Sequence, residues 1–466
     1  MSLDRSIVRA GLSGLSSARE WNKFAQDINT LWNTKAGPGL KLTKGEPWLL
    51  EYADVEPPPE PDQPITTWFN NTCVRVFVWR DDAWDYGSEN PPLAFFVSGA
   101  FTTLNATSTL RLAKVVKGPT STSARATTFC NRVDFTAATA FFTKNKDNTE
   151  QLFIGSQVAN SYDGGSGWNA HLLNWQTGAE DPTWTGANCT FPLMGMVGIA
   201  SVSGRLLIHD YFTLFSVNLS GVVQNTHVRS GNMNMHSLLN DGVNAYLSCA
   251  WVSTGGYSGS LNPQGLRKLN ADGSQNGAWV TATGLGSECG CYFGTLPNLE
   301  LWNAGDTNIY TSASLEYGSA LTWNGTAFGF GTGTGGIMKV SALGAAAGTS
   351  LGIFPSFYDR ANAFCKSPAG ELWFGYEVNG LETASQAFFA TDPYQLYKYN
   401  EATDTATYFN GFNDIVIDCQ YFSTVNGVQQ FIVVGAFTTY QGEPAERIVF
   451  IDQDGNRLAD LLWPDY

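Results

Sequence analysis

The chain has 466 residues, which is longer than one ordinary domain of about 100–200 residues, so it predicts several domains or a large architecture such as a barrel, propeller or solenoid. Aromatic residues make up 13% of the chain, charged residues only 14% against about 25% in a typical protein, and 49 glycines complete a profile rich in strands and turns. The net charge of −15 repels phosphate groups, so we expect neither nucleic acid nor an anionic membrane as a partner.

The opening residues contain no apolar core of signal-peptide length, and no segment approaches the ~18 apolar residues of a membrane-spanning helix. We therefore expect a soluble chain without a targeting signal. The closest pair among the eight cysteines is Cys289 and Cys291, a spacing that fits neither a zinc site nor a thioredoxin motif. This pattern favours buried free thiols in a reducing cytosol, and the disulfides of an exported protein are the alternative.

Residues 1–65 form a predicted N-terminal arm. Ser17 and Glu20 make a capping-box pattern that predicts a helix over 17–33. Apolar side chains at one-turn spacing give this helix a continuous stripe, made of Trp21, Phe24, Ile28, Leu31 and Trp32 with Ala25 among them. No second long helical pattern exists in the sequence to cover this stripe. We expect the helix to dock onto a partner or another copy of the chain, with packing inside the molecule as the alternative.

A short alternating strand is predicted at 40–43, and a proline-rich segment follows at 56–64. Five prolines between 57 and 64 hold the backbone extended, which is typical of a semi-rigid spacer. The spacer predicts a boundary between the arm and a second domain over 66–466.

The second domain contains an internal repeat. The sequence Gly-Ala-Phe-Thr-Thr occurs at 99–103 and again at 435–439, each time after a short apolar run. Related apolar runs end at 155, 209, 248, 312 and 375, so the units follow one another at about 56 residues.

Each run is followed by a second strand that often ends in turn chemistry, as at 270–274 and 452–456. Three or four strands in such a unit fit one blade of a β-propeller. The repeat therefore predicts an all-β fold, a seven-bladed β-propeller in which the apolar runs are inner strands. We expect residues from the N-terminal side, either 74–79 or part of the arm, to complete the last blade.

The segment 435–456 resembles the delta-sixty-type propeller repeat, whose consensus runs Gly-x-Phe-Thr, then Gly, then Arg-Ile-x-Arg-Leu-Asn-x-Asp-Gly. The segments 99–103 with Arg111, and 266–274, resemble it too, and the arm's 37–43 is similar to N-terminal segments of phage structural proteins. The resemblance implies a structural protein of a tailed-bacteriophage virion, in the tail, baseplate or capsid exterior. It also implies a chain made in the host cytoplasm that joins other virion proteins, through its arm, in a symmetric assembly.

Motifs that carry chemistry are few. The four histidines (His171, His209, His227 and His236) show no metal-ligand spacing, and Asp452, Asp454 and Asn456 fit a hairpin turn better than a calcium loop. We therefore predict a non-enzymatic protein with no catalytic residue, no metal and no cofactor.

One segment favours an enzymatic alternative. Residues 161–168 match the sialidase Asp-box, Ser-x-Asp-x-Gly-x-x-Trp, which is a structural turn that normally recurs and here is single. Carboxylates for a propeller-type glycoside hydrolase would be Asp163, or Asp81, Asp82 and Asp85.

Three tryptophans predict a glycan-stacking loop for host attachment. Trp168 lies in the Asp-box, and Trp175 and Trp184 flank the polar stretch 178–181, so their indole faces suit stacking on a sugar ring of a host-surface glycan. The alternative is that these side chains belong to propeller cores.

Overall fold

The computed structural model divides into two compact units, Met1–Gln63 and Pro64–Tyr466. The predicted helix over 17–33 with its docking residues, the strand at 40–43 and the spacer at 56–64 lie outside the described residues, so these remain predictions. The structure describes residues 65, 67–80, 91–105, 107–108, 111–118, 124–126, 140–145, 150–160, 168–184, 198–209, 213–228, 233–240, 244–251, 266–276, 308–314, 321–323, 326–328, 335–341, 349–350, 354–355, 361–377, 381–382, 387–388 and 394–464.

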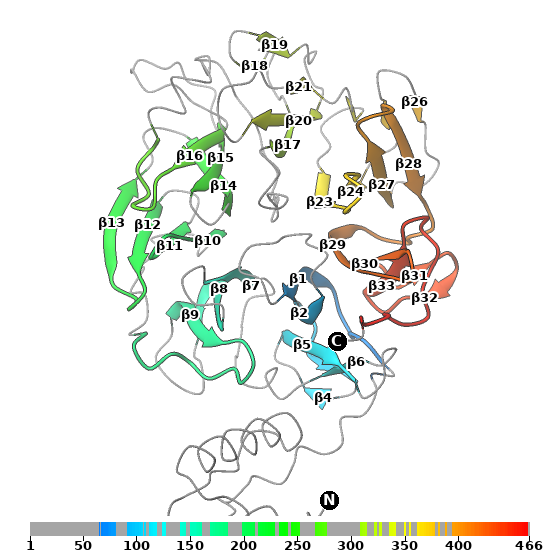
Figure 1. Cartoon of the computed structure of the whole chain (residues 1–466), viewed down its shortest axis with the longest axis horizontal. Coiled ribbons are helices and arrows are strands. Elements are labelled where there is room, and N and C mark those ends of the chain that lie inside the picture. Colours follow the sequence, from blue (N-terminus) through cyan, green and yellow to red (C-terminus); the bar gives the residue numbers. More distant parts are fainter. Residues whose placement is uncertain are drawn as a thin grey trace, which may run out of the picture. The chain divides into compact units, whose positions relative to one another are not determined.

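Every helix or strand assigned within these residues is a strand, and every sheet is antiparallel (Figure 1). Strands that follow one another in the chain pair in the same order, as short polar turns between apolar runs dictate. The first sheet comprises β1 (Cys73–Arg80), β2 (Pro92–Gly99), β5 (Leu112–Lys117) and β6 (Ala124–Ala126). The last comprises β29 (Val416–Val425), β30 (Val428–Gly435) and β33 (Ile448–Asp452).

Sheets of the same kind lie between these two in the chain. They are β7 (Ala140–Lys144), β8 (Gln151–Asn160) and β9 (Trp168–Asn174); β10 (Gly198–Val202), β11 (Arg205–His209), β12 (Thr213–Asn218) and β13 (Val223–Val228); β14 (Met233–Asn240), β15 (Ala245–Trp251) and β16 (Leu266–Leu269); β17 (Asn308–Ser314), β20 (Gly335–Ser341) and β21 (Thr349–Ser350); and β23 (Ala361–Lys366), β24 (Leu372–Glu377), β27 (Tyr394–Asn400) and β28 (Thr405–Phe409).

Smaller pairings complete the described strands. They are β3 (Thr103–Leu104) with β4 (Thr107–Ser108), β18 (Leu321–Trp323) with β19 (Thr326–Phe328), β31 (Thr439–Tyr440) with β32 (Glu443–Pro444), and β22 (Phe354–Pro355) with β25 (Leu381–Glu382) and β26 (Ala387–Phe388).

Several neighbouring sheets touch through their first strands. Strand β7 contacts β1, β10 contacts β7, β14 contacts β10 and β29 contacts β23, while β1 lies directly beside β29. Because the last sheet of the chain packs on the first, this order is typical of a β-propeller. The all-β class is confirmed, and the number of seven blades stays a prediction.

Two details of the sequence prediction differ from the structure. Most of the apolar runs form the second strand of a sheet, paired on both sides, rather than the innermost strand. Strand β1, which contains the expected closing segment 74–79, pairs with β2 over Cys73–Arg80 and adds no strand to the last sheet. A strand is buried on both faces wherever neighbouring sheets pack on both sides of its own sheet, so the apolar composition of a run does not reveal whether it is the first or the second strand.

Candidate functional site: the seam between the first and last sheets

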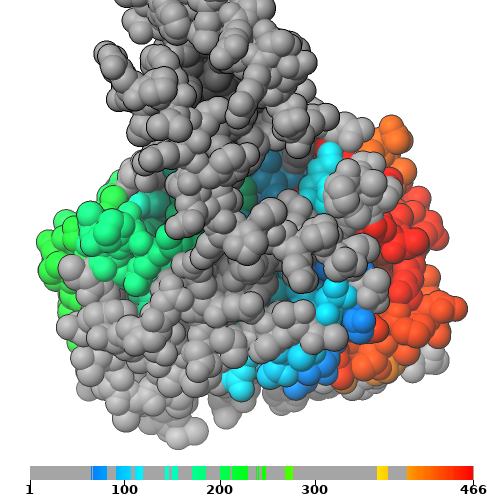
Figure 2. Space-filling model, turned by 90° about the horizontal axis from the view of Figure 1, so that it is seen from below, coloured from blue at the N-terminus to red at the C-terminus, as the bar shows by residue number. Residues whose placement is uncertain are grey.

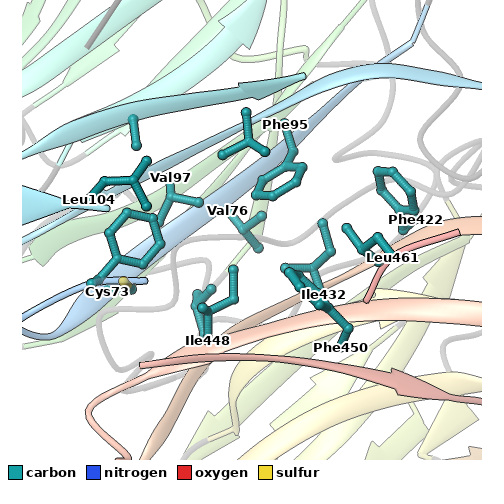
Figure 3. Close-up of a cluster of buried hydrophobic side chains, with 14 of the residues drawn as sticks. Cys73, Val76, Phe95, Val97, Leu104, Phe422, Ile432, Ile448, Phe450 and Leu461 are labelled. Carbon is teal, nitrogen blue, oxygen red and sulfur yellow. The ribbon is translucent and has the colours of Figure 1, made fainter. Parts of the chain in front are cut away.

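Buried polar side chains of the first and last sheets meet where β1 contacts β29, and we call this contact, with residues 461–464, the closure seam. Its apolar side is one continuous core to which both sheets contribute (Figure 3). Val76, Phe95 and Val97 come from the first sheet, while Ile432 and Phe450 come from the last. In Figure 2 the blue and cyan surface of the first sheet likewise adjoins the red surface of the last.

Side chains of β29 bind the backbone of β1 across the closure seam. The carboxylate of Asp418 accepts a hydrogen bond from the Val76 amide at 3.0 Å, and the Gln420 side-chain oxygen accepts one from the Val78 amide at 2.9 Å. Strand β1 is an edge strand, so these amides face away from β2 and would otherwise be buried donors without an acceptor. The two side chains thus supply the acceptors that the backbone of a neighbouring strand would otherwise provide.

Two arginines of β1 extend this polar contact. The guanidinium of Arg80 donates to the carbonyl oxygens of Tyr421 at 2.9 Å and Phe422 at 2.7 Å. Burial lowers the pKa of Arg75 to about 10, and the neighbouring Asp418 carboxylate opposes that shift. Asp418 is 0% exposed, so the Val76 amide and the Arg75 cation, rather than water, stabilise its charge.

The C-terminal residues occupy the same seam. The side chain of Gln430, on β30, makes two hydrogen bonds with the backbone of Leu462. Its Nε2 donates to the Leu462 carbonyl at 2.8 Å, and its Oε1 accepts from the Leu462 amide at 2.7 Å. The ammonium group of Lys117, on β5, donates to the Pro464 carbonyl at 2.8 Å. Residues 461–464 therefore link the two sheets.

The repeated Gly-Ala-Phe-Thr-Thr sequence forms the same turn in both sheets. In the first, the Ala100 amide donates to the Thr72 carbonyl at 2.8 Å; in the last, the Ala436 amide donates to the Ile415 carbonyl at 3.0 Å. A Cβ atom on Gly99 or on Gly435 would lie 2.2 Å from that same carbonyl oxygen, so only glycine fits either position. The prediction that these segments are two copies of one unit is confirmed in three dimensions.

An asparagine that the sequence analysis missed holds each copy. The Asn70 side-chain oxygen accepts from the amides of Thr102 and Thr103 at 2.9 and 3.2 Å. The Asn413 oxygen accepts from the amides of Thr438 and Thr439 at 2.8 and 2.9 Å. The signal was available, since Phe-Asn stands shortly before an apolar strand at 69–70 and at 412–413.

Another repeated device connects neighbouring sheets. In three places, a side chain on the third strand of one sheet donates a hydrogen bond to a backbone carbonyl in the turn that follows the third strand of the next sheet. The donors and acceptors are Lys114 with Trp175 and Gln176 at 2.8 Å each, Ser216 with Ala271 at 3.2 Å, and Lys398 with Gln453 at 2.7 Å. These donors and acceptors are 55 to 62 residues apart in the chain. The spacing of these contacts agrees with the repeat of about 56 residues.

The turns predicted at 270–274 and 452–456 are present. Gly273 and Gly455 have φ values of +82° and +78°, which favour glycine. The Asp452 carboxylate accepts from the amides of Asp454 and Asn456, so these residues form the predicted hairpin turn.

The predicted glycan-stacking residues belong to buried clusters where they are described. Trp175 stacks on Trp79 with ring centroids 5.2 Å apart, and the Lys114 ammonium lies 4.7 Å from its ring centroid. Trp184 donates its indole N–H to the Ala170 carbonyl at 3.1 Å. Both side chains are less than 10% exposed, so stacking there would need rearrangement, and glycan binding stays a prediction. The side chain of Trp168 lies outside the described residues.

Of the other carboxylates and histidines considered as candidate site residues, some lie outside the described residues and some within them. The carboxylates Asp81, Asp82, Asp85 and Asp163, and the side chain of His236, lie outside the described residues. His171 is buried with Nδ1 2.8 Å from Glu180 Oε1, and the His227 ring bonds the Asp272 carbonyl at 2.9 Å. His209 is buried as well. In the part of the chain that the structure describes, no three His, Cys, Asp or Glu side chains are grouped to hold a metal ion, and no helix is long and apolar enough to span a membrane.

No protein-family model and no curated protein matches the chain. Among solved structures, the chain is similar to the β-propeller domain of Cps50 (Swd1) from Myceliophteria thermophila at 10% identity, over 80% of this chain and 96% of that one, with a TM-score of 0.40. It is also similar to the WD40 domain of Pan2 from Neurospora crassa, at 10% identity over 68% and 75% of the two chains, with a TM-score of 0.38. These structural neighbours are β-propeller domains of the WD40 type, and nothing in the comparisons bears on the delta-sixty-type repeat or on a phage origin.

Proposed function

We propose that this protein is a non-enzymatic structural component of a bacteriophage virion, docked through its N-terminal arm and displaying a seven-bladed β-propeller for assembly, bracing or host-surface recognition. The phage assignment rests on the sequence resemblance of the repeat and of residues 37–43.

The observation that carries the docking role is the anchoring of the first described residues of the second unit. Ile65 and Trp68 pack against the core that the first and last sheets share. The Trp68 ring lies 5.2 Å from that of Phe450 and 6.4 Å from that of Phe95, one in each sheet. The Trp68 amide also donates to the Glu446 carboxylate. A pull on the chain before residue 65 would therefore be shared by both sheets, as an attachment point requires.

The experiment measures incorporation of the chain into particles. In a phage or prophage that encodes it, we expect mass spectrometry of purified particles to detect the full-length protein. The double variant Trp21→Ala/Ile28→Ala, which breaks the apolar stripe, should fall at least about tenfold in particle content while the soluble protein stays folded, since losing two buried anchors costs several kcal/mol of binding.

The matched control is Lys23→Ala/Asp27→Ala, which changes two polar residues of the same predicted helix and should be incorporated like the wild type. Absence of the wild-type chain from purified particles would overturn the virion role. Equal incorporation of both double variants would overturn docking through the stripe.

A further inference from the structure

We propose that Cys365 and Cys419 are a redox-active pair that peroxide converts into a disulfide joining the last two sheets. Cys365 lies on β23 and Cys419 on β29, in two different sheets that pack on each other. Their sulfur atoms are 3.5 Å apart, with the Cys419 thiol donating to the Cys365 sulfur, and neither cysteine is in a disulfide. A disulfide bond is about 2.05 Å long, so the sulfurs need to approach by about 1.5 Å, within reach of side-chain rotation.

The local packing brings the two backbones close. Gly375, on β24 beside β23, faces β29, where an added Cβ would lie 2.9 Å from the Val416 side chain and 3.1 Å from its carbonyl oxygen. The absence of a side chain at Gly375 thus permits the close approach of β29 that places Cys419 against Cys365. Trp373, Tyr421 and Phe431 belong to the same buried cluster as the two cysteines.

The burial of the pair selects the kind of oxidant. Cys365 is 3% exposed and Cys419 0% exposed, so a bulky disulfide such as oxidised glutathione has no room to form a mixed disulfide. Hydrogen peroxide is small and neutral, and it can enter during local opening of the sheet contact.

The reaction balances with peroxide as the two-electron oxidant. One thiolate attacks a peroxide oxygen, the O–O bond breaks, and a sulfenic acid forms while hydroxide leaves with the thiol proton as water. The second thiolate attacks the sulfenic sulfur, the S–S bond forms, and a second hydroxide leaves as water with the second thiol proton. Each sulfur loses one electron and the peroxide becomes two water molecules.

The experiment treats the full-length protein with hydrogen peroxide and maps its peptides without reduction. We expect a linked peptide joining Cys365 to Cys419 and a rise in Tm of about 5 °C, because the bond closes a loop of 54 residues in the unfolded chain. A phosphine reductant should reverse both changes.

The variant Cys419→Ala should lose the linked peptide and the rise in Tm. The matched control Cys73→Ala, which removes a buried thiol elsewhere, should keep both. Peptide mapping of the wild type decides the matter even if a variant folds poorly. Oxidation of other cysteines without a Cys365–Cys419 link, or over-oxidation of Cys419 to a sulfinic acid without the link, would overturn the proposal.

Discussion

The first and last sheets contain the same turn in different settings. Gly99 and Gly435, with Asn70 and Asn413, make matching hydrogen bonds in the two sheets. The polar side chains that join the first and last sheets lie outside this motif, since Asp418 and Gln420 of the last sheet bind the edge of the first. The repeated sequence therefore fixes a turn within a sheet, and the hydrogen bonds between these two sheets depend on other side chains.

A second difference lies at the position after the two threonines. The first sheet has Leu104 there and the last has Tyr440, and each forms a β-bridge to the phenylalanine beside the asparagine of its copy, Phe69 and Phe412 respectively. Only the tyrosine adds a polar bond, in which its hydroxyl donates to the Gly455 carbonyl at 2.6 Å. The same backbone turn thus carries an ionisable group in one copy alone.

The largest expected effect on stability comes from Asp418, which lies outside the repeated Gly-Ala-Phe-Thr-Thr turn. Asp418→Ala should lower the free energy of unfolding by about 3–5 kcal/mol, because it leaves the Val76 amide without that acceptor and the Arg75 cation without that carboxylate. Urea denaturation followed by tryptophan fluorescence measures the loss. Asp454→Ala, at an exposed carboxylate of the same sheet, is the control and should change stability by less than about 0.5 kcal/mol. Similar losses in the two variants would contradict a special role for the closure seam.

The two glycines test whether the copies are energetically equivalent. Gly99→Ala and Gly435→Ala should each cost about 2–3 kcal/mol, because the new Cβ must push a carbonyl oxygen away. Gly427→Ala meets no atom within 4 Å and should cost about 1 kcal/mol from its positive φ alone. Thermal unfolding gives the three values, and a difference above about 1 kcal/mol between the first two would break the equivalence.

The two asparagines should have smaller and matching effects. Asn70→Ala and Asn413→Ala each remove an acceptor for two amides and should cost about 1–2 kcal/mol. Hydrogen exchange should speed up at Thr102 and Thr103 in the first variant, and at Thr438 and Thr439 in the second. Asn→Asp at either position keeps the oxygen acceptor and serves as the control, with exchange close to that of the wild type.

The smallest expected effect is a dependence of stability on pH that Tyr440 gives to the copy in the last sheet and that Leu104 does not give to the copy in the first. Burial raises the pKa of Tyr440 from 10 to about 12, so between these pH values the folded chain holds a proton that the unfolded chain has lost. Stability should therefore be nearly unaffected by this group well below pH 10 and should fall by about 1 kcal/mol as the pH rises from 10 to 11. Urea titrations across this range should show a shallower fall in Tyr440→Phe. Leu104→Met, a conservative change in the other copy, should leave the wild-type slope, and parallel slopes in all three proteins would contradict the assignment.

Local features of the fold were predictable from the sequence, and the contacts between sheets were not. The turns at 270–274 and 452–456 follow from Gly273 and Gly455, because a positive φ selects for glycine wherever it occurs. Asp418 and Gln420 interrupt an apolar strand, and in a sequence they look like residues of a solvent-facing side. The amide groups that donate to them, on Val76 and Val78, lie 342 residues away in the chain, a separation that no local pattern reports.

The hydrogen bonds from the third strand of one sheet to the turn of the next affect how far the sequences of the repeat units can diverge. The accepting turns contribute main-chain carbonyl oxygens, which every residue type carries, so substitution at Gln176, Ala271 or Gln453 leaves the acceptor in place. Only the donors Lys114, Ser216 and Lys398 must keep a suitable side chain. Copies of the unit can therefore drift apart in sequence until little more than a strand pattern remains, while the contacts that hold neighbouring sheets together persist.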